Sequence, residues 1–310
     1  MIGCENMFLR IGTRGSPLAV IQAELVRDGL LAAHNCLKVD VVKIMTTGDR
    51  IQDRTLADIG GKGLFTKEIE KALVNKHIDI AVHSAKDMLT ELPDGLVLGP
   101  ILKREDSRDA LISRSGERLD QLSQGAIVGT ASLRRQAQIL SYRPDLSVIP
   151  FRGNVATRLQ KLNQGLADAT LLAVAGLNRL QKLDVISEII GIDVLLPAAG
   201  QGAICLEIRA DDEYTANLCA ILNHKKTAVE VLAERSILAV LDGSCRTPIG
   251  VLGNVNTDAD TIILRAMVAK PDGSVVHKGK RRGLVKDAEL MGLDLGQELK
   301  KKSAGSVLKS

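Results

Sequence analysis

Arginine side chains recur in this sequence directly after short apolar segments, at positions where a strand would end. The first follows FLRIG, in the segment TRGSPLA, where Arg14 stands near Ser16 and Pro17. Serine can cap a helix and proline suits its first turn, so this segment predicts a helix start. The free N–H groups there, together with the Arg14 guanidinium, would bind an anion. A capped helix with a surface arginine is the alternative.

Three later segments repeat this design with further arginines. The candidate residues are Thr130, Ser132, Arg134 and Arg135 in VGTASLRRQ, Arg152, Asn154 and Arg158 in FRGNVATRLQ, and Arg179 in AGLNRL. A guanidinium matches the planar geometry of a carboxylate or a phosphate. The sequence has no GxxxxGK[ST] loop or acidic metal-binding cluster to handle a nucleotide, so we predict a ligand with several carboxylates.

The segment HSAKD places Lys86 and Asp87 directly after the apolar segment IDIAV. Asp87 could bind an N–H group, stabilise a developing cation or transfer protons. A solvated salt bridge is the alternative. His83 is interpreted as structural, because no Ser/His/Asp pattern surrounds it.

Cys245 lies in the polar loop sequence DGSCRTPIG, beside Arg246, which could favour the thiolate. It could be a nucleophile or a covalent tether, although a lone loop cysteine is usually neither. The glycine-rich segment ADIGGKGLFTKEI (57–69) predicts a mobile lid that carries Phe65. A flexible turn before a helix is the alternative.

The composition narrows the class of protein. The 310 residues allow about two to three domains, and a net charge of +4 with 2% aromatic residues and no tryptophan disfavours nucleic-acid binding by base stacking. No apolar segment approaches the roughly 20 residues of a membrane span, and the first residues lack a signal-peptide pattern. We therefore expect a cytoplasmic protein without a membrane partner. We also expect five free thiols and no metal site.

Apolar segments alternate with amphipathic helical patterns from Phe8 onward, which is typical of α/β sheets. The segments are FLRIG (8–12), VDVVKIM (39–45), IDIAVH (78–83), GLVLGPIL (95–102), AIVGT (126–130), LSVIPF (146–151) and ATLLAVA (169–175). Residues 104–113 and 196–203 are candidate hinges between two similar lobes. Ligands of such sheets bind beyond the carboxyl ends of the strands, where the arginines would gather.

The pattern changes after about residue 222 to a helix, a hairpin and a helix, which predicts a small α+β domain. Thr227 and Glu230 form a capping-box pattern at the start of the first helix. Pro271-Asp272-Gly273 predicts the hairpin turn, and residues 287–302 predict the last helix.

Eight ordered motifs together resemble the porphobilinogen deaminase family. They are RIGTRGSPLA, GGKGLF, IAVHSAKDM, VGTASLRRQ, FRGNVATRLQKL, LLAVAGLNRL, LPAAGQGA and GSCRTPIG, and the resemblance runs from about residue 9 to residue 293. It implies a transferase of porphyrin and heme biosynthesis. Such an enzyme polymerises porphobilinogen into the linear tetrapyrrole hydroxymethylbilane and releases ammonia. The acetate and propionate groups of the substrate would account for the arginines.

The same resemblance implies a dipyrromethane cofactor, attached to Cys245 as a thioether. Asp87, with Lys86 beside it, would be catalytic: it would bind pyrrole N–H groups and stabilise the cation left when ammonia departs. The implied cofactor-binding residues are Cys245, Lys86, Asp87, Thr130, Ser132, Arg134, Arg135 and Asn154. The implied substrate-binding residues are Arg14, Ser16, Phe65, Arg152, Arg158 and Arg179.

Family membership also implies a fold: two doubly wound α/β lobes similar to periplasmic binding proteins, and a small C-terminal α+β domain with the cysteine. The implied domains are residues 1–102 with 203–221, residues 103–202, and residues 222–310, in a monomeric protein. The fold alone would also suit a two-lobed protein that binds or senses a carboxylate ligand, because fold does not fix function.

Overall fold

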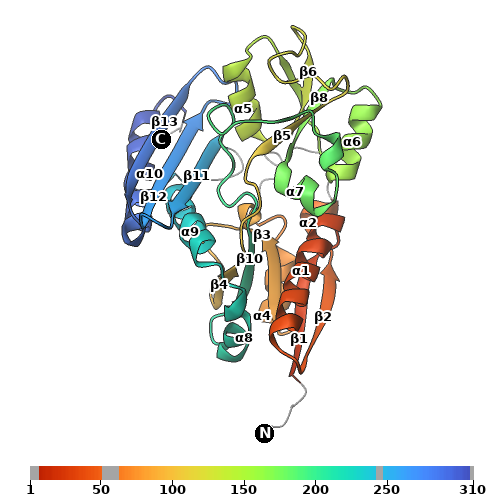
Figure 1. Cartoon of the computed structure of the whole chain (residues 1–310), viewed down its shortest axis with the longest axis vertical. Helices are drawn as coiled ribbons and strands as arrows, with labels where there is room; N and C mark the ends of the chain where they lie inside the picture. Colours follow the sequence, from red (N-terminus) through yellow and green to blue (C-terminus); the bar gives the residue numbers. More distant parts are fainter. Residues whose placement is uncertain (1–6, 51–62, 242–246, 308–310) are drawn as a thin grey trace. The chain divides into compact units, whose positions relative to one another are not determined.

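The computed structural model describes residues 7–50, 63–241 and 247–307 (Figure 1). Two compact units divide the chain. The first unit is described over residues 7–50, 63–104 and 203–228, and the second over 105–202, 229–241 and 247–307.

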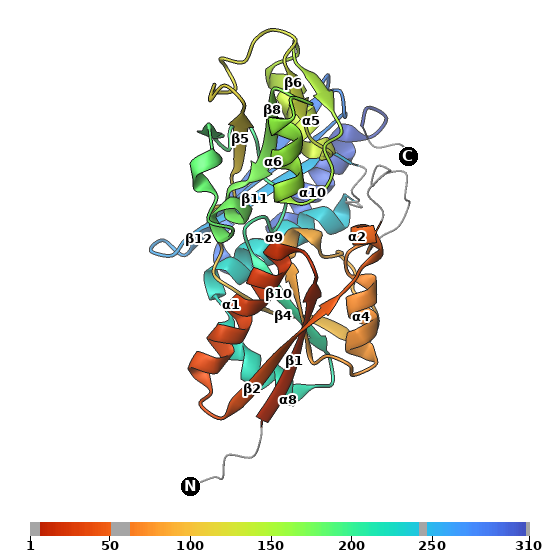
Figure 2. The ribbon, with the colours of Figure 1, turned by 90° about the vertical axis from the view of Figure 1, so that its right-hand side faces the viewer.

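The first unit is a lobe built on a five-stranded sheet in the order β2-β1-β3-β10-β4 (Figure 2). Its strands are β1 (Met7–Arg14), β2 (Leu37–Ile44), β3 (Ile80–Ser84), β4 (Leu96–Ile101) and β10 (Ile204–Arg209). Strand β1 runs parallel to β2 and β3, whereas β10 runs antiparallel to β3 and β4. Its helices are α1 (Pro17–Ala33), α2 (Thr47–Arg50), α4 (Lys67–Val74) and α8 (Glu213–Cys219), with short 3-10 helices η1 (Ala85–Asp87) and η3 (Ala220–Leu222).

Alternating side chains divide this sheet into two apolar faces. Leu9 and Ile11 of β1 pack with Val26 of α1 on one face. On the other face, Ile69 of α4 packs with Ala81 of β3. The period of two along each strand thus places one helix over each face.

The second unit contains a lobe with the same strand arrangement, in the order β7-β6-β8-β5-β9. The strands are β5 (Asp109–Ser113), β6 (Ile127–Gly129), β7 (Ser147–Ile149), β8 (Ala169–Ala173) and β9 (Glu188–Ile189). The helices are α5 (Leu133–Tyr142), α6 (Val155–Asn163), α7 (Val174–Arg179) and the 3-10 helix η2 (Leu183–Val185). Strand β6 is parallel to β7 and β8, and β5 is antiparallel to β8 and β9, so β5 holds the place that β10 holds in the first lobe.

The seven predicted apolar segments of the lobes all form strands, but the prediction of a hinge at 104–113 is wrong in its second half. Residues Asp109–Ser113 form β5, which is buried throughout. Charged neighbours hide this five-residue strand in the sequence. The strand β10 was also missed, because it follows directly on the second candidate hinge at 196–203.

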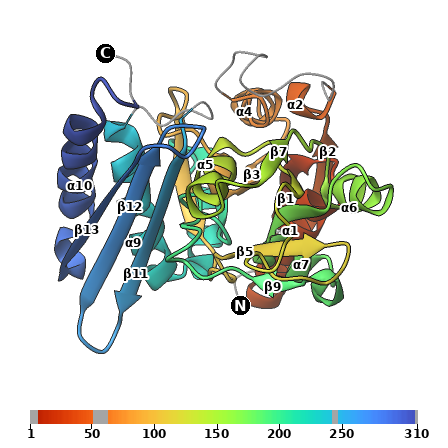
Figure 3. The ribbon, with the colours of Figure 1, turned by 90° about the horizontal axis from the view of Figure 1, so that it is seen from above.

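The second unit also carries a three-stranded antiparallel sheet, β11-β12-β13 (Figure 3). Its strands are β11 (Ile249–Asn256), β12 (Thr261–Ala269) and β13 (Val276–Leu284), and its helices are α9 (Lys225–Val240), η4 (Val285–Asp287) and α10 (Ala288–Ser303). The predicted hairpin turn and last helix are confirmed: the Gly273 N–H donates to the Lys270 carbonyl at 2.9 Å, and Gly273 has a φ of 73°.

The predicted capping box at Thr227 and Glu230 is wrong. Helix α9 begins at Lys225, and the Thr227 N–H donates to His224 Nδ1 at 3.3 Å. The Glu230 carboxylate instead accepts a hydrogen bond from the Val255 N–H at 3.0 Å. A buried carboxylate needs strong donors, and the backbone of β11 supplies one that the local sequence does not reveal.

The cysteines differ in part from expectation. Cys205 and Cys219 are buried thiols outside any disulfide, as predicted, but Cys36 is disulfide-bonded. Five cysteines cannot all be paired within one chain, but an odd count still permits one pair. The prediction of five free thiols is therefore wrong for Cys36. Among the helices in the described part of the chain, none is long and apolar enough to cross a membrane.

Gly129 at the end of β6 allows a close contact that gives a stability test. A Cβ atom at this position would lie 2.4 Å from Cγ of Phe151, whose side chain is fully buried. We expect Gly129→Ala to lower the free energy of unfolding by about 1–3 kcal/mol, because the ring has no free space to move into. Urea denaturation measures the loss. The control Gly191→Ala meets no atom within 4 Å and should be near neutral; equal losses in the two variants would contradict the packing.

Candidate active site

In the first lobe, Arg14 lies at the end of β1, beside the start of α1. Ser16 caps α1 by accepting a hydrogen bond from the Ala19 N–H at 3.4 Å, as predicted. The Arg14 guanidinium pairs with Asp49 at 2.5 Å and lies 4.1 Å from the centroid of the Phe65 ring. Two predicted substrate-binding residues, Arg14 and Phe65, are therefore in contact.

Asp49 is a partner that the sequence did not reveal. Burial alone would raise the pKa of Asp49, but hydrogen bonds from Arg14 and Thr46 and the Arg14 charge hold it below its ordinary value. The carboxylate stays ionised and fixes the orientation of the guanidinium. The stacked guanidinium and ring of Arg14 and Phe65 form a flat cationic surface.

Lys86 and Asp87 lie in η1, directly after β3, and both side chains are exposed. Their backbone is fixed on both sides. The Ala85 N–H donates to the Ala203 carbonyl at 3.0 Å, and the buried Met88 anchors the other end. The structure thus presents an exposed carboxylate on an ordered turn at the carboxyl end of a strand, as the sequence predicted.

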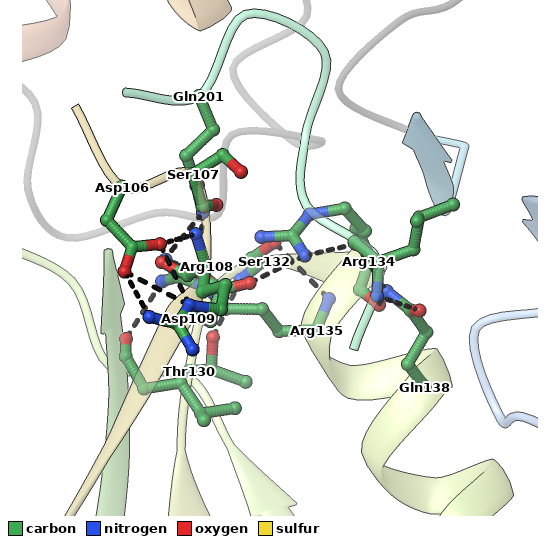
Figure 4. A network of polar contacts seen from close by, with 12 residues as sticks. Asp106, Ser107, Arg108, Asp109, Thr130, Ser132, Arg134, Arg135, Gln138 and Gln201 are labelled. Atoms are coloured by element: carbon green, nitrogen blue, oxygen red, sulfur yellow. Dashed lines mark hydrogen bonds and ion pairs between the residues drawn. The ribbon is translucent and has the colours of Figure 1, made fainter. Parts of the chain in front are cut away.

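In the second lobe, Arg134 and Arg135 converge on Asp109 (Figure 4). Arg134 Nη1 lies 2.8 Å from Asp109 Oδ2, and Arg135 Nη2 lies 2.7 Å from Asp109 Oδ1. Gln201 also donates to Asp109 Oδ1, at 2.9 Å. Asp109 is fully buried and each arginine is nearly so. Strand β5, helix α5 and the segment before β10 therefore meet at one carboxylate.

The charges of Arg134 and Arg135 keep the Asp109 carboxyl ionised. Burial alone would raise the pKa of Asp109, but the two guanidinium charges hold it far below its ordinary value. Burial lowers the pKa of Arg134, and the Asp109 charge opposes this change while Arg135 adds to it. Two cations thus share one anion, which leaves a net positive charge inside the lobe.

Thr130 and Ser132 shape the start of helix α5, which carries both arginines. The Ser132 N–H donates to Thr130 Oγ1 at 3.2 Å, and the Arg135 N–H donates to Ser132 Oγ at 3.4 Å. These contacts fix the first turn of α5 and so the direction in which the two arginines leave it.

Arg152 and Arg158 form a second cationic group at the start of α6. Asn154 caps this helix by accepting a hydrogen bond from the Thr157 N–H at 2.9 Å. The Arg158 Nε–H donates to the Gly153 carbonyl at 3.0 Å, whereas Arg152 Nη1 is buried without a hydrogen-bond partner. A buried N–H of a guanidinium without an acceptor is costly, so this group indicates an anion site.

The electrostatics of Arg158 support the same conclusion. Burial, together with the charges of Arg135 and Arg152, lowers the pKa of Arg158 to about 10. Two other guanidiniums therefore lie within electrostatic reach of Arg158. A bound carboxylate would restore the balance of charge.

Arg179 is the last residue of α7, and its neighbours Gly202 and Glu105 were not among the predicted site residues. Its Nη2 donates to the Gly202 carbonyl at 2.7 Å, and the neighbouring Asn178 donates to Glu105 at 2.8 Å. Burial lowers the pKa of Arg179, and the Glu105 charge opposes this change.

The structure brings the predicted residues together in two places. Arg14, Ser16 and Phe65 cluster in the first lobe, and Arg134, Arg135, Arg152 and Arg158 cluster in the second. Cys245, the predicted attachment residue, lies outside the described residues. In the described ranges, no group of three or more His, Cys, Asp or Glu side chains could hold a metal ion.

Comparison with known families decides the assignment. A family model described as "Porphobilinogen deaminase, dipyromethane cofactor binding domain" matches residues 9–217, and one described as "Porphobilinogen deaminase, C-terminal domain" matches residues 228–301. The chain belongs to the porphobilinogen deaminase family. It is also 52% identical to the porphobilinogen deaminase of Paracoccus denitrificans (strain Pd 1222) over 295 residues, which cover 94% of this chain and 93% of the relative.

Solved structures of periplasmic binding proteins are similar in part of the fold. The arginine-specific protein STM4351 of Salmonella typhimurium is 12% identical with a TM-score of 0.41, over 72% of this chain and 94% of that one. The probable amino-acid-binding protein ytmK of Bacillus subtilis is 10% identical with a TM-score of 0.43, over 70% of this chain and 91% of that one. The predicted fold class, two such lobes and a small C-terminal domain, is confirmed by the sheets and by the two family models.

The Asp109 network gives a test by mutation. We expect Asp109→Asn to lower the free energy of unfolding by about 3–5 kcal/mol, because two buried guanidiniums lose their counter-charge. The matched control is Asp106→Asn, whose partner Arg108 is 44% exposed, and its loss should stay below about 1 kcal/mol. Urea denaturation at neutral pH measures both variants.

The same pair of proteins tests the pKa of Asp109. Because its folded pKa lies below the ordinary value of 3.8, the stabilisation is present at neutral pH and is lost as the pH falls below 3.8. The stability gap between the wild type and Asp109→Asn should therefore narrow in acid. A gap that does not change with pH would contradict an ionised Asp109.

Proposed function

We propose that this chain catalyses the stepwise, head-to-tail polymerisation of porphobilinogen to hydroxymethylbilane, as a transferase. The observation that carries this proposal is the buried, unpartnered Nη1 of Arg152, next to Arg158 with its lowered pKa. A site with excess guanidinium suits a substrate with an acetate and a propionate on each ring. Family membership supplies the chemistry that the cationic group alone leaves open.

The residues present fit a dipyrromethane cofactor, because its carboxylates would supply the acceptors that the second lobe lacks. We propose that Cys245 carries this group as a thioether. The residues proposed to hold it are Lys86, Asp87, Thr130, Ser132, Arg134, Arg135 and Asn154. When bound, the group supplies the pyrrole to which the first substrate ring is joined. Because Arg134 and Arg135 are held by Asp109, their fork geometry is fixed before any ligand arrives.

Asp87 is the proposed catalytic carboxylate. Its exposed position on an ordered turn suits it to accept hydrogen bonds from pyrrole N–H groups and to stabilise the cation that the substrate becomes when its C–N bond breaks. Each addition forms one C–C bond, releases the amine as ammonia and removes one proton from a ring carbon. Lys86 adds a cation beside Asp87 for a ligand carboxylate.

Arg14, Ser16, Phe65, Arg152, Arg158 and Arg179 are the proposed substrate-binding residues. The Arg14 guanidinium, stacked on Phe65 and held by Asp49, is pre-oriented for a substrate carboxylate or ring. The division into residues 1–102 with 203–221, residues 103–202 and residues 222–310 stays a prediction. So do the monomeric state, the cytoplasmic location and the absence of nucleic-acid or membrane partners.

The attachment at Cys245 is tested by intact mass. We expect the protein purified after loading with porphobilinogen to exceed its sequence mass by one dipyrromethane unit, and Cys245→Ser to show the sequence mass alone. The control Cys219→Ser removes a buried thiol and should keep the added mass. Loaded wild-type protein at the sequence mass, or added mass on Cys245→Ser, would rule out the tether.

The role of Asp87 is tested by turnover. We expect Asp87→Asn to lower kcat about 10²–10⁴-fold with an unchanged urea midpoint, because the amide cannot balance a developing positive charge. Asp94→Asn, an exposed aspartate that follows in the same loop, should keep normal turnover. Near-normal kcat in Asp87→Asn would show that another group stabilises the cation.

A further inference from the structure

Helix α4 lies over one face of the sheet in the first lobe (Figure 2). A group of buried polar side chains lies on this face. In β10, Leu206 belongs to the apolar cluster with α1, so its neighbour Glu207 points to the opposite face. In β3, Val82 belongs to the same apolar cluster, so its neighbour His83 also points to the opposite face. Glu207 and His83 therefore lie side by side on the face that α4 covers.

Some buried oxygen atoms of this group have no hydrogen-bond partner. His83 Nε2 lies 3.1 Å from Glu207 Oε2, and both side chains are buried. Glu70 of α4 lies within electrostatic reach of both and is 5% exposed. Glu70 Oε1 and Glu207 Oε1 are buried and have no hydrogen-bond partner. Unpaired buried oxygens of this kind are expensive when charged.

The excess of acids over bases in this group favours a retained proton. Two carboxylates face one imidazole, so a net negative charge would remain even if the imidazole were protonated. The other titratable groups near this face are Lys67, which is exposed, Cys205, which is a buried thiol, and Arg209, Arg10, Asp79 and Asp212, which pair among themselves. Among these groups the cations are either exposed, as Lys67 is, or paired with aspartates, as Arg10 and Arg209 are.

We propose that Glu70 is the protonated member of a buried triad with His83 and Glu207, and that this triad positions the residues proposed for catalysis. The triad joins the first turn of α4 to the ends of β3 and β10. Phe65 precedes α4 by two residues, and Lys86 and Asp87 follow His83 by three and four. The inference about positioning rests on the proposed roles of Phe65 and Asp87, whereas the retained proton does not.

The electrostatics agree with this geometry. Burial is the main cause that raises the pKa of Glu70, and the Glu207 charge acts in the same direction. A hydrogen bond with Thr66 and the charges of His83 and Lys67 oppose this rise without cancelling it. Because the folded pKa is raised, the stabilisation from neutral Glu70 is complete below the ordinary value of 4.5 and is lost as the pH rises through the folded pKa. In that window the folding equilibrium constant falls by up to about tenfold per pH unit.

The retained proton is tested by the pH dependence of unfolding in the full chain. We expect Glu70→Gln to remove this loss above pH 4.5, because the amide is a neutral mimic of the protonated acid. The control Glu213→Gln, at an exposed position of α8 in the same unit, should keep the wild-type dependence. Infrared spectra should also lose the band of a protonated buried carboxyl in Glu70→Gln. Identical pH profiles and spectra for wild type and Glu70→Gln would overturn the proton assignment.

The positioning role is tested by turnover of the loaded enzyme. We expect kcat of Glu70→Gln to match the wild type at pH values below the folded pKa of Glu70 and to hold above it, where the wild type declines. Glu207→Gln, which deprives His83 of its acid, should lower kcat at least about tenfold while porphobilinogen binding persists. Loss of kcat in Glu70→Gln with full activity in Glu207→Gln would overturn the proposal. If neither variant changed the pH profile of kcat, the positioning role would be wrong, regardless of the kcat measured for Asp87→Asn.

Discussion

The buried ion pair of Asp109 with Arg134 and Arg135 is the interaction on which the second lobe depends. One fully buried carboxylate holds two guanidiniums from the first turn of α5, and Gln201, from the segment before β10, donates to the oxygen that Arg135 contacts. Such a network is costly to bury and costlier to break. The network has one more cation than anion, and Arg158, with Arg152 near it, adds further positive charge close to Arg135. The lobe thus buries more cations than acids, which suits a ligand with several carboxylates.

The two lobes share a strand order but differ in the charge that they bury. The fourth strand of each sheet carries a buried acid, Glu207 in β10 and Asp109 in β5. In the second lobe Asp109 is outnumbered by cations, so it stays ionised. In the first lobe Glu207 faces Glu70 and His83, where acids are in excess and a proton is retained. The same topology therefore supports a cationic ligand site in one lobe and a proton-holding core in the other.

The sequence predicted the parts of the fold that repeat a local period, such as β1, β3 and the hairpin around Gly273. It missed β5, because Asp109 and its charged neighbours mask a five-residue apolar strand. The partners of the predicted site residues were also missed: Asp109 lies 25 residues before Arg134, and Asp49 lies 35 residues after Arg14. Such pairings depend on how strands are ordered in the sheet. For Asp109 the local signal was its place at the start of the apolar segment DALIS, where a charged residue is unusual.

The cationic side chains are proposed to serve polymerisation of a carboxylate-rich pyrrole. This role is tested by following ammonia and linear tetrapyrrole in a solution of the purified wild-type chain with porphobilinogen. We expect both products to accumulate over many turnovers, with one ammonia released for each pyrrole incorporated. Tight binding of porphobilinogen without release of ammonia would contradict it, and would indicate a protein that binds the ligand without transforming it.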